Sequence, residues 1–183
     1  VLSPDDTRTA EKIAQCAPEA RELEDCVKAC RALLARTPDN VTARKILARA
    51  LILAGGIDGS EVSDAIEASC ASAAERIDLA VEIAMTRHAD GHSAQALTEL
   101  EQARRRHPSS ARICIVQGRI LKEIGDHQAA VAALEAGLDL DGADPVGYHV
   151  MGQVLFSLGA LDGAVTALRR ASELAPNSTD VLT

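Results

Sequence analysis

Apolar residues recur with the period of an α-helix between positions 145 and 175, and a glycine divides this stretch in two. In the first half, apolar residues lie three or four positions apart and so share one helix face; they are Tyr148, Met151, Leu155 and Leu158. Gly159 follows, and glycine commonly ends a helix in the left-handed conformation. In the second half, the apolar positions are Ala164, Leu168, Ala171 and Leu174. The pattern predicts an antiparallel pair of helices.

Three further residues mark the limits and the packing of this pair. Pro145 can open the first helix, because the N–H that proline lacks has no intrahelical partner in the first turn. Pro176 ends the second helix, since proline does not continue one. Gly152 stands among the apolar positions of the first helix, where it costs about 1 kcal/mol relative to alanine. We therefore expect the second helix to approach the first closely at Gly152.

The pattern is repeated at a constant spacing of 34 residues. Gly118 precedes Gly152 by 34 residues, and Ala84 precedes Gly118 by another 34. The turn residues Gly91, Gly125 and Gly159 keep the same spacing, as do the second-helix pairs Ala96 and Leu100, Ala130 and Leu134, and Ala164 and Leu168. Helix pairs this short cannot bury their apolar faces alone, so repeated units are expected to stack on one another.

The clearest unit contains Tyr148-x₂-Met151-Gly152-x₂-Leu155, then Ala164-x₃-Leu168 and Pro176. This arrangement resembles the tetratricopeptide repeat, with every spacing kept and two of its three large aromatics replaced by leucines. The resemblance implies an all-α fold, a right-handed α-solenoid of antiparallel helix pairs. It also implies a concave groove, lined by the first helices, that binds peptides or other proteins.

The N-terminal part fits the repeat less well. Helices are expected over residues 5–16 and 18–36, then from Val41, and over about 60–73. Pro18 departs from the family spacing, and the segment after Gly55-Gly56 lacks the closing proline. We therefore predict a single domain over residues 1–183 with about ten helices: degenerate repeats over 1–76, and regular repeats over 77–110, 111–144 and 145–178.

Composition and net charge favour some classes of fold and function over others. The chain of 183 residues is 47% apolar and 25% charged, with only 1% aromatic residues, which suits closely packed helices better than strands. Its net charge of −8 argues against a nucleic-acid surface as the main function. No apolar run approaches the ~18 residues of a membrane span. We expect a cytoplasmic protein.

The five cysteines also favour a reducing compartment. Cys26 and Cys30 lie one helical turn apart, which is compatible with a metal or redox pair. In the repeat register, however, they take the core positions of a second helix, and Cys114 takes the position of Tyr148. No histidine joins Cys26 and Cys30 at a spacing typical of zinc sites. We interpret these three cysteines as core residues.

Three other constellations of chemically active residues have structural explanations. His88 and His92 have metal-compatible spacing, but Gly91 puts a turn between them. Asp139-x-Asp141-Gly142-x-Asp144 lacks the remaining ligands of a calcium loop and fits turn chemistry. The basic run 104–107 ends a helix, where cations complement the helix dipole. No phosphate-binding or nucleophile motif is present. We therefore expect no enzyme active site, metal site or cofactor.

The resemblance to the tetratricopeptide repeat also implies which residues face the groove. These are Lys45, Arg49, Val81, Met85, His88, Arg112, Ile115, Arg119, Lys122, His149, Gln153 and Phe156. A carboxylate clamp of the chaperone-binding subgroup is doubtful, because Arg49 and Glu82 stand where that subgroup has asparagines. The groove is rich in cations, opposed nearby only by Asp78 and Glu123. The leading hypothesis is a non-catalytic interaction module for an extended, acidic protein segment.

Two alternatives remain open. Residues 177–183 read as the start of another helix, so we expect that the natural chain continues past Thr183 or that a partner docks on this end. If the chain continues, the domain would present substrate to the catalytic part of a larger enzyme, such as a bacterial glycosyl- or sulfotransferase. The other alternative is a self-associating scaffold that forms homo-oligomers through its groove or its last repeat.

Overall fold

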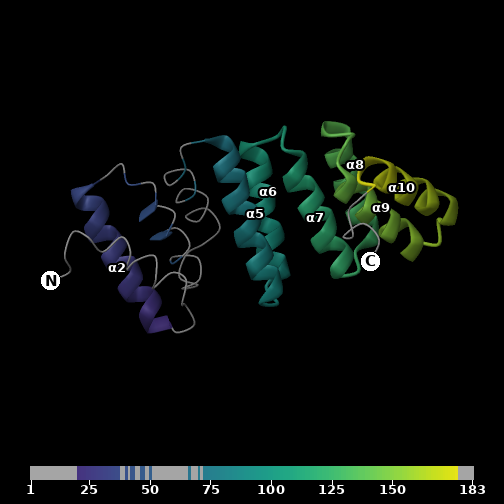
Figure 1. Ribbon diagram of the computed structural model, residues 1–183. Helices are drawn as coiled ribbons and strands as arrows, with labels where there is room; N and C mark the ends of the chain where they lie inside the picture. The colour runs from purple at the N-terminus through teal and green to yellow at the C-terminus, as the bar shows by residue number, and fades with distance from the viewer. Residues whose placement is uncertain are drawn as a thin grey trace. The chain divides into compact units, whose positions relative to one another are not determined.

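The computed structural model describes residues 20–37, 40, 42–43, 46–47, 50, 66, 70 and 72–176. These residues form helices without any strand (Figure 1). The seven helices among them are α2 (Ala20–Arg36), α5 (Ala73–Ala89), α6 (Ser93–Arg106), α7 (Ala111–Glu123), α8 (His127–Leu140), α9 (Pro145–Ser157) and α10 (Leu161–Leu174).

The predicted all-α class is confirmed for this part of the chain. About ten helices and a right-handed superhelix stay predictions, and the helix expected over residues 5–16 lies outside the described residues. The chain divides into two compact units, Val1–Ile83 and Ala84–Thr183, with the boundary inside α5. Among the described residues, no helix is long and apolar enough to cross a membrane.

In the first unit, α2 supplies two cysteines to a small core. Cys26 and Cys30 are 1% and 0% exposed and cluster with Ile46 and Ala50. Burial, together with the neighbouring Cys26, raises the pKa of Cys30 to about 12. The interpretation of Cys26 and Cys30 as core residues is confirmed. Cys114, in α7, is also buried and free.

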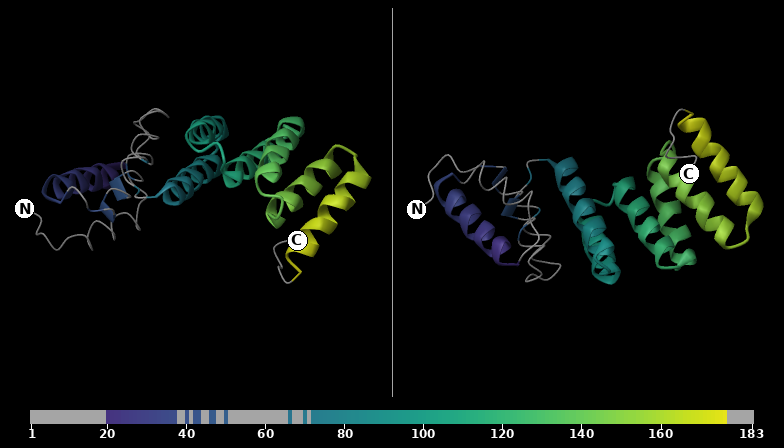
Figure 2. Two further views of the ribbon diagram at one scale, coloured as in Figure 1. Left: turned by 90° about the horizontal axis from the view of Figure 1, so that it is seen from above. Right: turned by 60° about the horizontal axis from the view of Figure 1, so that its bottom comes forward.

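In the second unit, α7 packs on α8, α9 packs on α10, and α8 and α9 join the two pairs (Figure 2). The core between them contains Ile115, Ala130, Leu134, Val150, Met151, Val154 and Ala167. Glycines allow the members of each pair to approach. A Cβ atom added at Gly152 would lie 2.6 Å from Leu168 Cγ, and one at Gly118 would lie 2.5 Å from Leu134 Cγ. The close approach predicted at Gly152 is confirmed.

The turns within the pairs use the glycines that the 34-residue spacing predicted. Gly91, Gly125 and Gly159 have φ angles of 86°, 85° and 76°, a region that other residues rarely adopt. After α9, the Ala160 N–H donates to the Leu155 carbonyl at 2.9 Å, which completes a Schellman cap. These turns direct each second helix back along the first.

The aspartates before α9 have the structural role expected of them. Asp144 Oδ1 accepts hydrogen bonds from the N–H groups of Val146 (2.8 Å) and Gly147 (3.1 Å), and so caps the helix. Asp141 Oδ1 accepts from the Ala143 N–H at 3.0 Å. Turn and cap chemistry thus accounts for Asp141 and Asp144.

Candidate protein-binding surface

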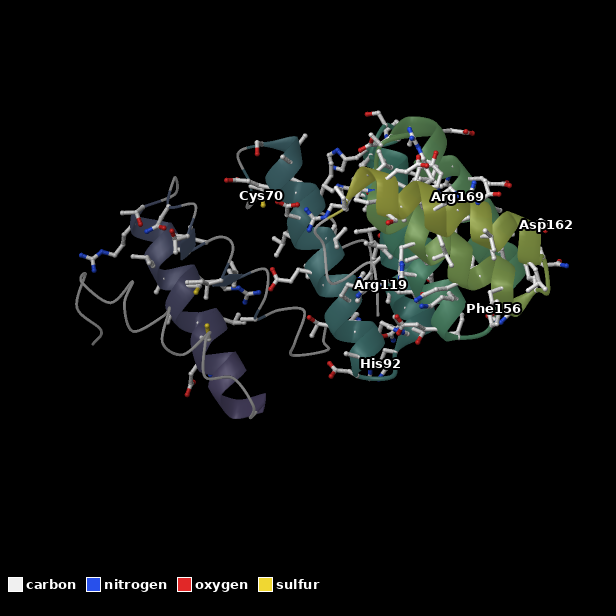
Figure 3. All side chains as sticks on the ribbon, turned by 45° about the vertical axis from the view of Figure 1, so that its right-hand side comes forward. Cys70, His92, Arg119, Phe156, Asp162 and Arg169 are labelled. Atoms are coloured by element: carbon white, nitrogen blue, oxygen red, sulfur yellow. The ribbon has the colours of Figure 1, made fainter. Side chains whose placement is uncertain are left out.

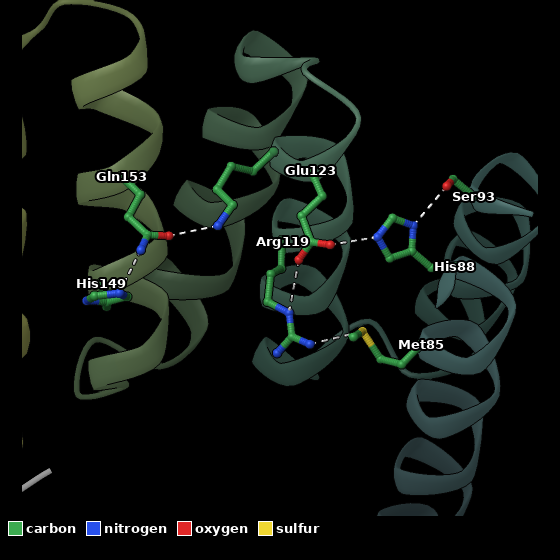
Figure 4. A network of polar contacts seen from close by, with 8 residues as sticks. Met85, His88, Ser93, Arg119, Glu123, His149 and Gln153 are labelled. Carbon is green, nitrogen blue, oxygen red and sulfur yellow. Dashed lines mark hydrogen bonds and ion pairs between the residues drawn. The ribbon is translucent and has the colours of Figure 1, made fainter. Parts of the chain in front are cut away.

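Polar side chains on α5, α7 and α9, the first helices of the three regular pairs, contact one another from each helix to the next. Met85 in α5, Arg119 in α7 and Gln153 in α9 are separated by 34 residues each, so they hold equivalent positions. Side chains around them connect the three helices (Figure 4). We call this set the polar ladder; it consists of Met85, His88, Ser93, Arg119, Lys122, Glu123, His149 and Gln153.

Between α5 and α7, the polar ladder centres on the Glu123 carboxylate. Its Oε2 accepts a hydrogen bond from His88 Nε2 at 2.8 Å, and its Oε1 lies 3.8 Å from Arg119 Nε. Arg119 Nη2 points at the sulfur of Met85, 3.5 Å away. Because a carboxylate only accepts, His88 Nε2 carries a proton, and in the neutral ring Nδ1 accepts from the Ser93 hydroxyl at 2.8 Å.

Between α7 and α9, the contacts are made by a lysine, an amide and a histidine. Lys122 Nζ donates to Gln153 Oε1 at 2.7 Å, and Gln153 Nε2 donates to His149 Nε2 at 2.9 Å. Since an ammonium group only donates, Lys122 fixes which way the Gln153 amide points. The amide is neutral, so this contact leaves the positive charge of Lys122 uncompensated.

The other residues predicted for the groove do not belong to the polar ladder. Phe156 is 66% exposed at the end of α9, and Arg112 is exposed near the start of α7 (Figure 3 labels Phe156 and Arg119). Val81 and Ile115 are buried, so neither offers a partner much surface. Lys45 and Arg49 lie outside the described residues.

Sequence reasoning missed two members of the polar ladder. Glu123 was recognised only as a charge near the groove, and Ser93 not at all. The signal for Glu123 was its place four residues after Arg119, because such positions face the same way on a helix. The contact between Ser93 and His88 crosses the turn from α5 to α6, where no helical period applies.

Comparison with known sequences identifies the repeats. Two models of the tetratricopeptide repeat match, one over residues 81–146 and one over residues 147–178, which together span more than half of the chain. The chain belongs to the tetratricopeptide repeat family. No curated protein matches the chain. Within this family, α5, α7 and α9 are the first helices of their repeats. Apart from Ser93 in α6, the polar ladder therefore lies on the helices that the resemblance predicts along the groove.

Several solved structures share the fold. MamA has a TM-score of 0.61 at 17% identity, and the match covers 96% of both chains. YrrB, a tetratricopeptide repeat protein with an unusual peptide-binding site, has a TM-score of 0.59 at 16% identity, over 94% of this chain and 86% of its own. The translocator chaperone SycD of Yersinia enterocolitica type III secretion has a TM-score of 0.53 at 19% identity. The match covers 57% of this chain and 79% of SycD. At these identities, the likeness concerns the fold alone.

Proposed function

We propose that this tetratricopeptide repeat protein is a non-catalytic interaction module that binds an extended protein segment with acidic side chains along the polar ladder. The observation that carries the proposal is the continuous series of side chains from α5 through α7 to α9, with Arg119 and Lys122 at its centre. Equivalent positions on stacked repeats suit a ligand that extends across several of them.

The chemistry of the polar ladder favours carboxylates as ligands. Arg119 carries a planar fork of donors that matches a carboxylate, and Lys122 adds a second cation three residues away on α7. Phe156, equivalent in register to Lys122, presents an exposed aromatic ring for an apolar side chain of the same ligand. YrrB, which has a peptide-binding site, supports a peptide as the kind of ligand.

The test is binding of a fluorescein-labelled hexaglutamate peptide, measured by fluorescence anisotropy, with hexaglutamine as the neutral peptide. We expect hexaglutamate to bind more tightly, and its affinity to fall as salt rises past about 0.15 M, where charges more than ~8 Å apart are screened. Arg119→Glu should weaken binding about tenfold, equivalent to about 1.4 kcal/mol. Absence of a difference between the two peptides would contradict the acidic preference.

A matched control separates a local effect from a change of net charge. Arg169 is exposed on α10 (Figure 3), outside the polar ladder, so Arg169→Glu changes the net charge by the same amount. We expect this variant to bind hexaglutamate nearly as well as the unmodified protein. Equal weakening by both variants would locate binding elsewhere.

A self-associating scaffold is the second candidate, favoured by exposed apolar residues on α10. Leu161 and Val165 lie one turn apart and are 58% and 55% exposed. A second copy covering this face would make the molecular mass rise with concentration. Light scattering over a concentration series tests this, with Val165→Lys as the variant that should keep the protein monomeric.

A further inference from the structure

We propose that Glu123 occupies, within the free protein, a carboxylate-binding subsite formed by Arg119 and His88, and that an acidic side chain of the ligand takes its place on binding. The inference rests on the proposed function and adds a specific subsite with a built-in competitor. Glu123 thereby sets a threshold, since a ligand must supply a carboxylate of its own to displace it.

The geometry shows one carboxylate shared between two donors. Glu123 Oε2 has a short contact with His88 Nε2 at 2.8 Å, whereas Oε1 lies 3.8 Å from Arg119 Nε. Hydrogen bonds of this type are usually 2.7–3.2 Å long, so Glu123 satisfies the histidine and leaves the guanidinium without a close oxygen from this residue.

The other contact of Arg119 within the described residues is also a weak one. Its Nη2 lies 3.5 Å from Met85 Sδ, and a thioether sulfur is a poor acceptor. A guanidinium has five N–H donors, and here they meet a sulfur and a distant carboxylate oxygen. Arg119 therefore has donors available for a ligand carboxylate that replaces Glu123, in the bidentate geometry that arginine favours.

Exposure makes the exchange accessible to a ligand. The side chains of Arg119 and Glu123 are 41% and 43% exposed, while His88 is 14% exposed. Ion pairs between such exposed groups contribute little to stability, so separating Glu123 from Arg119 costs little. His88 is less exposed, and its Nδ1 is hydrogen-bonded to the Ser93 hydroxyl. The imidazole is therefore the less mobile side of the subsite.

The position of Glu123 within its helix is a second, independent argument. It is the last residue of α7, where the helix dipole carries partial negative charge and an anion is unfavourable. Helix stability therefore does not explain a glutamate at this position. The contacts of Glu123 with His88 and Arg119 explain it instead.

Removal of the Glu123 charge should open the subsite. We expect Glu123→Gln to bind labelled hexaglutamate about three- to fivefold more tightly than the unmodified protein, because the ligand no longer competes with an internal exposed ion pair. Binding of hexaglutamine should not change. In the double variant Arg119→Gln/Glu123→Gln, the gain should disappear, since the group for which ligand and Glu123 compete is absent.

Glu173 provides the matched control. It pairs with Arg170 on α10 at 3.3 Å and is 55% exposed, so Glu173→Gln removes the same charge from an equivalent exposed ion pair. We expect no comparable gain in affinity. If Glu173→Gln tightens binding as much as Glu123→Gln, the effect is one of net charge and the inference is wrong.

The remaining outcomes distinguish this inference from the proposed function. If the unmodified protein binds hexaglutamate but Glu123→Gln binds it equally or less tightly, Glu123 is not a competitor, and only the further inference is wrong. If neither the unmodified protein nor Glu123→Gln prefers hexaglutamate over hexaglutamine, both proposals are wrong. Thermal unfolding followed by circular dichroism checks that every variant is folded.

Discussion

Gly152 in α9 and Leu168 in α10 pack so closely that a Cβ atom on residue 152 would lie 2.6 Å from Leu168 Cγ and 3.2 Å from the Ala164 carbonyl oxygen. Gly118 and Leu134 repeat this relationship between α7 and α8, at 2.5 Å. The absence of a side chain at these two positions therefore permits the close approach of the helices in a pair, which substitution can test.

Gly152→Leu should destabilise the protein by about 1–3 kcal/mol, because an overpacked interface forces the helices apart. Gly142→Ala is the control: its added Cβ would meet nothing closer than 3.6 Å, and Gly142 has no positive φ angle. Chemical denaturation followed by the helical circular-dichroism signal measures both. Equal stability of the two variants would show that α10 does not depend on Gly152.

The 34-residue spacing was sufficient to predict these features because each depends on one residue type at one position. Gly152 permits close approach, and Gly159 permits a positive φ angle, whatever their neighbours are. The same spacing placed Met85, Arg119 and Gln153 at equivalent positions of first helices. The N-terminal residues lack such regular markers, which is why residues 5–16 and 60–73 gave only general helix predictions.

The spacing could not predict which side chains on the surface meet. Ile115 holds a groove position by register, yet it is 4% exposed. An added Cβ at Gly137 or Gly147 would lie 2.8 Å or 3.1 Å from Ile115, so these two glycines in α8 and α9 let the isoleucine sink between the helices. Likewise, the contact of Glu123 with His88 depends on two side-chain conformations, which the sequence pattern does not specify.

Loss of the Asp144 cap should weaken α9. Asp144→Ala removes the acceptor of two N–H groups in the first turn, and we expect a loss of about 1 kcal/mol of stability. Asp139 is an exposed aspartate in α8, so Asp139→Ala serves as the control with the same charge change. Thermal unfolding compares the two. A stabilising effect of added calcium on the unmodified protein would contradict the explanation of these aspartates as cap and turn residues.

Alkaline pH should destabilise the first unit through Cys30. The pKa of Cys30 is raised from 9.0 to about 12 by burial and by Cys26, so the unfolded chain releases this proton at lower pH than the folded one. The stability contributed by the protonated thiol is complete below about pH 9 and is lost as pH rises toward about 12. We expect stability to fall less steeply above pH 9 in Cys30→Ala, measured by denaturant unfolding. Parallel pH profiles would show that Cys30 ionises normally.

Arg87 in α5 and Glu99 in α6 form an ion pair with little-exposed side chains, at 14% and 8%, with Arg87 Nε 3.0 Å from Glu99 Oε1. Burial raises the pKa of Glu99, although the Arg87 charge acts to lower it. The Arg87 charge therefore opposes the effect of burial and favours the ionised form of the Glu99 carboxylate. Arg87 also donates to Gln95 Oε1 at 3.1 Å.

Arg87→Met should cost about 3–5 kcal/mol at neutral pH, because it leaves a buried carboxylate without its counter-charge. The raised pKa of Glu99 means that the folded state holds its proton more tightly than the unfolded state does, so this cost should shrink as pH falls toward about 4.5 and Glu99 becomes neutral. Arg87→Met/Glu99→Gln should recover much of the loss at neutral pH. Removal of the exposed partner in Arg170→Met should cost no more than about 1 kcal/mol. Denaturant unfolding of these variants at neutral and acidic pH measures each free-energy change. If the cost of Arg87→Met depends neither on pH nor on Glu99→Gln, Arg87 stabilises the fold by packing and not through its charge.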